Sequence, residues 1–391
     1  MKRKGNFYKS IANLPNILRS IECASLGKTS RRNVAKVLDN DSEYAKRLLT
    51  MLVNKTYKPS PYIQKTIKDG SSGKERVIFK PRFFPDQVIH WALMRQLEPI
   101  LTRKMYAWSC ASIADRGIHY GQKHIEKILA KDRKHTKYCL KLDIRKFYPS
   151  VDKEILKQKF RKIIKDPDVL WLIDAIVDSS EQGLPIGNYT SQWFANFYLT
   201  DLDNYIKQDL KVKHYVRYMD DMVLFSSNKR ELHKIKSKID EFVAKEHLEI
   251  KNNWQLFKVD SRPLDFLGYR FYRGYTTLRR SNFLRFKRRV IKIYKKKIKL
   301  DEQYEIESNY LVEKYKDKLD KRQMKQLLSY IERNRSKNIS YLDACAVISM
   351  IGWVVHSNGY NYIHKYITKY ISIADCKEVI RNETRKRQKT T

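Results

Sequence analysis

Cysteine, proline and glycine are scarce in this chain of 391 residues, with five, ten and twelve of each. The odd number of cysteines and the lack of any C-x-x-C pair argue against a zinc site and a disulfide framework. This pattern is typical of a reducing compartment, so we expect a cytoplasmic protein. Because 42% of the residues are hydrophobic, the chain as a whole is not a disordered basic tail.

Long apolar runs and acidic residues are also few. The longest apolar run, 344–355, has about half of the roughly 20 residues that a bilayer requires, and no apolar signal-peptide core follows the basic N-terminus. We therefore expect no membrane segment. Lys and Arg number 81 against 43 acidic residues, which leaves a net charge of +38. Such an excess predicts a polyanionic partner, with nucleic acid ahead of an acidic membrane.

One segment concentrates the positive charge. The pattern is helical from Thr276 onward, and residues 279–299 contain eleven Lys or Arg and no acid, while Phe283, Phe286 and Val290 keep an apolar stripe. Such a helix packs through its apolar face and presents a positive face to phosphates. The alternative is an ordinary solvated face, for which charges of both signs are expected.

Hydrophobic periodicity predicts the elements ahead of this segment. Residues 1–60 are expected to be helical, with a break at Pro15. Two strands, 62–68 and 75–80, flank a glycine-containing turn and predict a hairpin. A helix with one buried face is expected over 86–101.

Carboxylates lie at the ends of three further predicted strands. Residues 137–144 alternate and end their polar side at Asp143, and the runs 214–218 and 222–225 flank the pair Asp220-Asp221. Carboxylates at neighbouring strand ends repel one another unless a cation lies among them. Hard oxygen ligands suit Mg²⁺ or Mn²⁺, and two such ions support nucleotidyl transfer. The alternative is an acid pair in a β-turn beside an unrelated capping Asp.

The surroundings of these carboxylates resemble the reverse transcriptase family. Four segments match, in the family's order, its first palm motif, its template- and nucleotide-contacting segment, its Y-x-D-D signature and its primer-grip element. They are Leu142–Ser150, Gly183–Gln192, Tyr218–Asp221 and Asp265–Arg270. The resemblance implies an RNA-directed DNA polymerase, a nucleotidyltransferase that acts on template RNA, a DNA primer and dNTPs. It also implies two Mg²⁺ ions, which Mn²⁺ can replace.

The same resemblance implies the roles of single residues at the reaction centre. The implied metal set is Asp143, Ile144, Asp220 and Asp221, with Asp143, Asp220 and Asp221 as the catalytic residues. Tyr148 follows Asp143 by five residues, where the family has an aromatic steric gate that favours dNTPs over rNTPs. Its alternative is a core aromatic. Arg76 would clamp the incoming triphosphate, a task suited to a planar fork of donors.

Other implied roles concern the nucleotide, the template and the primer. Ile186 and Gly187 belong to the nucleotide-binding set, where Gly187 allows close backbone approach to a base pair. The implied template and primer contacts are Ser191, Gln192, Tyr218, Met219, Leu267, Gly268 and Tyr269. Gln192 is equally well explained as a helix-capping residue. A general acid is expected after the Y-x-D-D hairpin, and Lys251 and Lys258 are both candidates.

The implied fold is α+β, a right-hand polymerase with fingers, palm and thumb. The fingers and an N-terminal helical region would occupy 1–136. The palm, with a small antiparallel sheet, would occupy 137–275 and include a helical insertion on the fingers side at about 153–182. A basic helical thumb would occupy 276–391.

The segment 186–192 fits the I-G-x-x-x-S-Q pattern of reverse transcriptases from bacterial diversity-generating retroelements. In that family a branched apolar residue at the position of Ile186 accompanies error-prone copying of template adenines, and a small basic accessory protein is expected. Antiphage defence reverse transcriptases, which use a dedicated non-coding RNA, have similar cores and are the first alternative. The others are a template-independent polymerase and an RNA-binding scaffold without activity, against which the three carboxylates argue.

Overall fold

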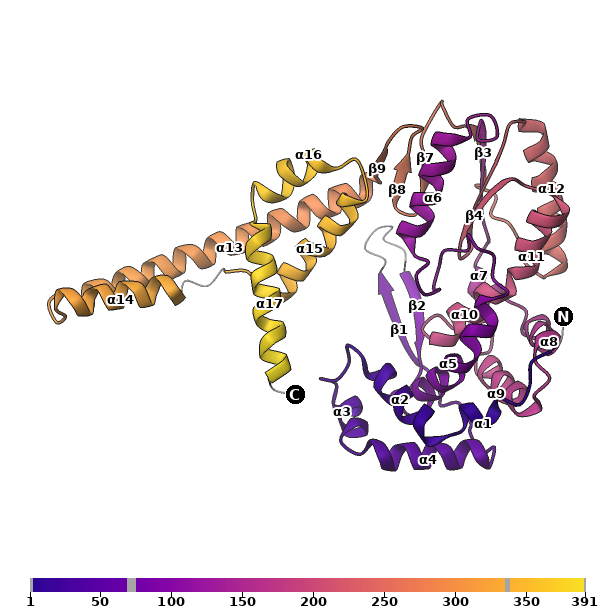
Figure 1. The fold of residues 1–391 in the computed structure, drawn as a ribbon, viewed down its shortest axis with the longest axis horizontal. Helices are drawn as coiled ribbons and strands as arrows, with labels where there is room; N and C mark the ends of the chain where they lie inside the picture. Colours follow the sequence, from indigo (N-terminus) through magenta and orange to yellow (C-terminus); the bar gives the residue numbers. More distant parts are fainter. Residues whose placement is uncertain (1–2, 69–74, 335–337, 390–391) are drawn as a thin grey trace. The chain divides into compact units, whose positions relative to one another are not determined.

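The computed structural model describes residues 3–68, 75–334 and 338–389. The chain forms two compact units, Met1–Arg262 and Pro263–Thr391. Both combine helices with a small antiparallel sheet (Figure 1). The predicted α+β class is therefore confirmed.

Four helices begin the first unit. They are α1 (Tyr8–Ile11), α2 (Leu14–Ser25), α3 (Arg32–Leu38) and α4 (Asp41–Val53). The prediction of helical structure over 1–60 is confirmed, but the expected break at Pro15 is wrong. Pro15 lies in the first turn of α2, where the missing N–H costs no intrahelical bond. The Asn13 side chain caps this turn by accepting a hydrogen bond from the Asn16 N–H at 2.9 Å.

A hairpin and a long helix follow. Strands β1 (Ile63–Lys68) and β2 (Glu75–Lys80) pair antiparallel, which confirms the predicted hairpin, although its connecting turn lies outside the described residues. The predicted helix over 86–101 is present as a short π-helical turn, η1 (Phe83–Gln87), and α5 (Val88–Thr102), whose inner face is fully buried.

The central sheet contains the predicted carboxylate strands. Its order is β4 (His214–Tyr218), β5 (Asp221–Ser226), β3 (Tyr138–Asp143) and β6 (Gln255–Lys258), all antiparallel. Helix α6 (Ile118–Lys131) packs against β4, and α12 (Lys229–Lys245) packs against β5 (Figure 1). All three predicted strands are confirmed.

The remaining helical segments of the first unit lie between β3 and β4 in the sequence. They are α7 (Phe147–Ser150), α8 (Lys153–Ile163), α9 (Pro167–Asp178), α10 (Tyr189–Tyr198), α11 (Thr200–Asn204) and the π-helical η2 (Tyr205–Asp209). Helices α8 and α9 occupy the predicted insertion at 153–182. Their buried apolar side chains join those of α1 to α5 and of the sheet in one continuous core.

The second unit begins with a three-stranded antiparallel sheet, β7 (Leu264–Phe266), β8 (Tyr269–Phe271) and β9 (Thr276–Leu278). Helical structure from Thr276 is therefore wrong over its first residues, because the β-branched Thr276 and Thr277 pair with β8 instead. The helices are α13 (Arg280–Tyr315), α14 (Lys321–Asn334), α15 (Tyr341–Val355), α16 (Tyr360–Ile363), η3 (His364–Thr368) and α17 (Ile373–Lys389).

The basic helix α13 is the longest element of this unit. It buries Phe286 and Val290 and leaves its charged residues outward, as the apolar stripe predicts. Helix α14 turns back along the far end of α13 (Figure 1). Within the described ranges, no helix combines the length and the apolar character that crossing a bilayer requires. The fingers, palm and thumb limits stay a prediction.

Candidate active site

The antiparallel register brings the three predicted carboxylates to one edge of the central sheet. Asp143, the last residue of β3, lies directly opposite Asp221, the first residue of β5. Tyr218 pairs with the same Asp221 from the β4 side, so Met219 and Asp220 form the two-residue turn between β4 and β5. Met219 has a positive φ of 54°, which is uncommon for a residue with a side chain.

Asp220 is mostly buried and lies near the negative charges of Asp143 and Asp221. Burial, followed by repulsion from Asp143 and Asp221, raises the pKa of Asp220 to about 7. Desolvation and like charge both disfavour the ionised carboxyl, and a cation placed between the carboxylates would reverse both effects. The electrostatics at this edge therefore favour a bound cation.

The two oxygens of Asp143 have different surroundings. Oδ2 accepts a hydrogen bond from the Lys251 ammonium at 2.5 Å, whereas Oδ1 is buried and has no hydrogen-bond partner. Lys251 is held there by the backbone, since its N–H donates to the Asp143 carbonyl at 2.8 Å and Ile250 bridges to Ile144. Lys258 lies opposite Tyr138, at the far end of β3. Of the two candidate lysines, the structure brings only Lys251 to the carboxylates.

This donor set suits a divalent cation such as Mg²⁺. Carboxylate oxygens are its preferred ligands, and the buried, unpaired Oδ1 of Asp143 is an oxygen left without a positive partner. In the described ranges, no three His, Cys, Asp or Glu side chains converge tightly enough to form a metal cluster. The Lys251 ammonium instead neutralises one side of Asp143. The chemistry fits the predicted ion, and the tight three-carboxylate arrangement is not formed here.

Tyr148 lies beside the Y-x-D-D turn. The chain leaves β3 through Lys146, whose φ is 44°, and the short helix α7 then presents Tyr148 toward the turn, where its hydroxyl is 3.8 Å from the Met219 sulfur. Burial, and next the nearby Asp220 carboxylate, raise the pKa of Tyr148 to about 12. The ring also packs against the core, so the gate and the core-aromatic interpretations share this position.

The segment that contains Ile186 and Gly187 packs closely against strand β2 of the β1–β2 hairpin. The Phe79 N–H donates to the Ile186 carbonyl at 2.8 Å. Gly187 has a φ of 133°, and a Cβ there would lie 2.4 Å from the Phe79 carbonyl oxygen. The close approach that Gly187 permits in this structure is therefore to the backbone of β2. Contact with a base pair stays a prediction.

The two polar residues of α10 have separate environments. Ser191 is buried and its hydroxyl has no hydrogen-bond partner. Gln192 is exposed, and its Oε1 accepts a hydrogen bond from the Ser112 hydroxyl at 3.0 Å. The capping alternative for Gln192 is wrong, because Asn188 occupies the N-cap position. Template contact by Ser191 and Gln192 stays a prediction.

Arg76 lies on the exposed strand β2, opposite Ile67. Its position on the hairpin agrees with the sequence-based expectation, while contact with a triphosphate stays a prediction.

The predicted primer-grip residues lie in the second unit, at the turn between β7 and β8. Leu267 and Gly268 have φ values of 53° and 82°, the pattern of a tight hairpin turn. Tyr269 is fully buried, stacks on Trp353 with ring centroids 5.4 Å apart, and donates its hydroxyl to the Trp353 carbonyl at 3.0 Å. The Tyr269 side chain therefore belongs to the packing of its unit.

A buried charged residue that the sequence pattern did not predict lies next to the turn. Arg217, on β4, has no exposed surface and pairs with the equally buried Asp203. One of its guanidinium nitrogens also donates to the Met219 carbonyl at 3.1 Å. The available signal was a lone Arg in the apolar strand His214–Tyr218, which alternation alone assigns to a polar face.

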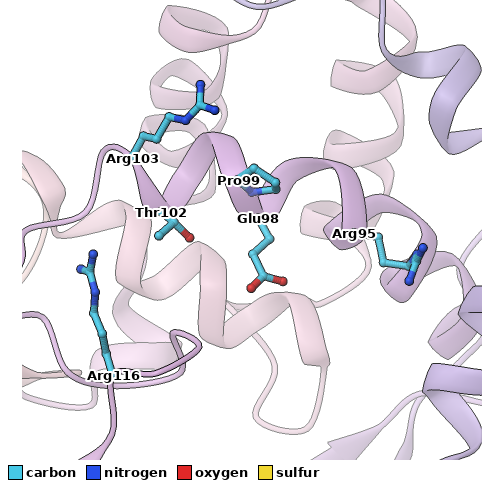
Figure 2. Close-up of a pocket in the computed structure, with 6 residues that line it drawn as sticks. All are labelled: Arg95, Glu98, Pro99, Thr102, Arg103 and Arg116. Atoms are coloured by element: carbon cyan, nitrogen blue, oxygen red, sulfur yellow. The ribbon is translucent and has the colours of Figure 1, made fainter. Parts of the chain in front are cut away.

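A hollow of about 470 Å³ lies away from these residues, on α5 and the segment before α6. It is lined by Arg95, Glu98, Pro99, Thr102, Arg103 and Arg116 (Figure 2). Glu98 lies between Arg95 on one side and Arg103 and Arg116 on the other, and burial raises its pKa. None of the predicted site residues lines this hollow, so it is distinct from the carboxylate site.

Comparison with known proteins agrees with this geometry. The family model "Reverse transcriptase (RNA-dependent DNA polymerase)" matches residues 67–271, just over half of the chain. Retron Ec73 reverse transcriptase from Escherichia coli is 34% identical over 107 residues, which cover 24% of this chain and 34% of that protein. The match thus spans about a third of the relative's length.

Among solved structures, the apo telomerase of Candida tropicalis truncated from its C-terminal domain is 15% identical, with a TM-score of 0.43 and 59% of each chain covered. A second structure of apo telomerase from the same organism is 14% identical, with a TM-score of 0.39 and coverage of 60% of this chain and 52% of the other. The matched region contains Arg76 on β2 and all four predicted motif segments, the last of which forms the β7–β8 turn. The chain belongs to the reverse transcriptase family.

Proposed function

We propose that this protein is an RNA-directed DNA polymerase that makes cDNA by two-metal nucleotidyl transfer. The observation that carries the proposal is the register that puts Asp143, Asp220 and Asp221 at the same end of neighbouring strands, with a buried, unpaired oxygen on Asp143. The raised pKa of Asp220 adds a second reason to expect a cation at this edge. Family membership supplies the chemical class.

The placement of the residues supports a role for each of them. Asp143, Asp220 and Asp221, with the backbone carbonyl of Ile144, would hold Mg²⁺. Bound Mg²⁺ supplies Lewis-acid activation of a primer hydroxyl and charge neutralisation at the phosphates. Tyr148 lies beside the turn, where its ring would limit the space at the sugar of an incoming nucleotide.

Lys251 is the better placed of the two candidate proton donors. Its ammonium already lies at the carboxylate edge, and it would give a proton to the leaving pyrophosphate. The basic face of α13 would bind the phosphates of the template and the product.

Two biological roles compete. The I-G-x-x-x-S-Q segment, with its branched Ile186, supports a diversity-generating retroelement and the small basic accessory protein expected with it. The alternative is an antiphage defence reverse transcriptase that uses a dedicated non-coding RNA. The local identity with a retron reverse transcriptase from Escherichia coli supports a bacterial enzyme in either role. Both roles use the same carboxylates and the same polymerase chemistry.

Sequencing the RNA and DNA that co-purify with the wild-type protein, beside Asp220→Asn, tests the proposal. We expect cDNA with the wild type alone. Substitutions concentrated at template adenines would support the diversity-generating role. Faithful cDNA from one fixed non-coding RNA would support the defence role. Bound RNA without cDNA in either protein would contradict the polymerase and favour the RNA-binding scaffold, and DNA with no RNA template would indicate template-independent synthesis.

A further inference from the structure

A buried polar network connects the Met219–Asp220 turn to helices α10 and α11. Arg217 occupies the next-to-last position of β4, two residues before Met219, and its side chain has no exposed surface. Its Nε and Nη2 donate to the two carboxylate oxygens of Asp203 on α11, at 2.8 and 2.5 Å. Its Nη1 donates to the Asn196 side-chain oxygen on α10 at 3.0 Å and to the Met219 carbonyl at 3.1 Å.

Every group in this network has a partner. The Tyr215 hydroxyl, on the same face of β4, donates to Asp203 Oδ1 at 2.7 Å, and Asn196 donates in turn to the Ala111 carbonyl at 2.7 Å. The Arg217 backbone is fixed as well, because its N–H donates to the Trp108 carbonyl and its carbonyl accepts from the Cys110 N–H. Burial lowers the pKa of Arg217, but the Asp203 carboxylate more than offsets this, so the guanidinium stays charged.

Stability alone does not explain why a charged network lies here. A buried ion pair loses so much hydration that well-packed apolar residues of similar size often stabilise a fold equally well. What an apolar replacement lacks is a directed donor toward the Met219 carbonyl. That carbonyl belongs to a residue with a φ of 54°. This backbone conformation costs energy for any residue other than glycine and persists only where the surroundings hold it.

We infer that Arg217 is a positioning residue that holds the Met219–Asp220 turn in the geometry that lets Asp220 share a cation with Asp143. Asp203 and Asn196 orient its guanidinium, which then holds the Met219 carbonyl in place through a hydrogen bond. This inference rests on the proposed function, because it concerns the same carboxylates. It assigns no contact with substrate to Arg217.

The test compares Arg217→Lys with wild type in two measurements. The first is Mn²⁺ binding without nucleotide, followed by electron paramagnetic resonance of free Mn²⁺. The second is primer extension on an RNA template, separated into kcat and KM for the dNTP. Lysine keeps the charge but lacks the fork that reaches three acceptors at once. We expect Mn²⁺ affinity and kcat to fall by about 10- to 100-fold, with KM changed much less.

Lys159→Met is the matched control. Lys159 is also a buried cation of the first unit, with ion pairs to Asp201 and Glu246. It makes no hydrogen bond to the Met219–Asp220 turn. This variant should lose thermal stability while keeping the Mn²⁺ affinity and kcat of the wild type, measured well below its melting temperature. Equal losses of Mn²⁺ affinity in both variants would overturn the inference, because they would indicate a general effect of buried charge.

Asn196→Ala provides a milder second variant if Arg217→Lys fails to fold. It removes one acceptor that orients the guanidinium, and a smaller loss of Mn²⁺ affinity in the same direction is expected. Unchanged Mn²⁺ affinity in a folded Asn196→Ala or Arg217→Lys protein would overturn the positioning role. A wild type that binds Mn²⁺ but makes no DNA would contradict the proposed function alone, since the binding comparison among variants would still stand.

Discussion

Two tight turns in this protein are supported by opposite means. The Met219–Asp220 turn of the first unit is supported from behind by the charged guanidinium of Arg217. The Leu267–Gly268 turn of the second unit is supported by aromatic packing, with Gly268 so close to Trp353 that a Cβ would lie 2.8 Å from the ring. Each turn has a residue other than glycine at positive φ.

The difference shows what each turn is suited to do. A turn supported by directed hydrogen bonds keeps its own carboxylate free to face Asp143. A turn supported by ring packing commits its Tyr269 side chain to the interior and leaves mainly backbone for a ligand. The first arrangement fits chemistry, and the second fits a structural platform.

The largest effect is expected from Asp143→Asn. This substitution removes one of the three carboxylates proposed to hold Mg²⁺, so RNA-templated primer extension should fall by about 1,000-fold. The control is Asp240→Asn on α12, which breaks a half-buried ion pair with Lys236 and should leave extension unchanged. Equal activity in the two variants would place the chemistry elsewhere.

A smaller loss is expected from Lys251→Met. If the ammonium protonates the leaving pyrophosphate, kcat should fall by about 100-fold, as is typical when a general acid is removed. Lys258→Met is the matched control, because Lys258 lies at the other end of β3 and should be dispensable for kcat. A larger loss in Lys258→Met than in Lys251→Met would reverse the assignment.

The second turn should respond in stability. Gly268→Ala places a Cβ against Trp353 and the Asn282 amide at a φ of 82°, which should destabilise the protein by about 1–3 kcal/mol. Gly274→Ala serves as its control, because no atom lies within 4 Å of the added Cβ. Thermal unfolding of the two variants measures the difference, and equal melting temperatures would show that ring packing does not support the turn.

The smallest effect concerns pH. Since the metal-free Asp220 carboxyl has a pKa of about 7, cation binding must displace its proton below that pH. Apparent Mn²⁺ affinity should therefore be constant above pH 7 and fall by at most about tenfold per pH unit below it. Titrations at pH 6, 7 and 8 measure this. Affinity that is constant from pH 6 to 8 would contradict a protonated Asp220 at the site.

Much of this arrangement could be predicted from sequence because the signals are local. Alternation predicted β3, and the two runs that flank Asp220-Asp221 predicted β4, β5 and the turn between them. The choice between Lys251 and Lys258 could not be made in this way, since it depends on which of them pairs with the end of β3.

The role of Arg217 was equally hidden. Its partners Asp203 and Asn196 lie on α11 and α10, and they meet Arg217 only through the packing of these helices against β4. No local sequence pattern indicates that contact. The extended start of the second unit at Thr276 was missed for a related reason. Its strand exists through pairing with β8, which overrides the helical periodicity of the residues that follow.

The most direct test of the central claim is primer extension on a defined RNA template with dNTPs and Mg²⁺, with Asp220→Asn as the blank. Both proteins should bind the RNA equally, since the substitution leaves the basic surfaces unchanged. We expect DNA products of template-directed sequence from the wild type and none from Asp220→Asn. Template-directed DNA synthesis by Asp220→Asn at the wild-type rate would contradict the assignment of the carboxylate edge as the active site.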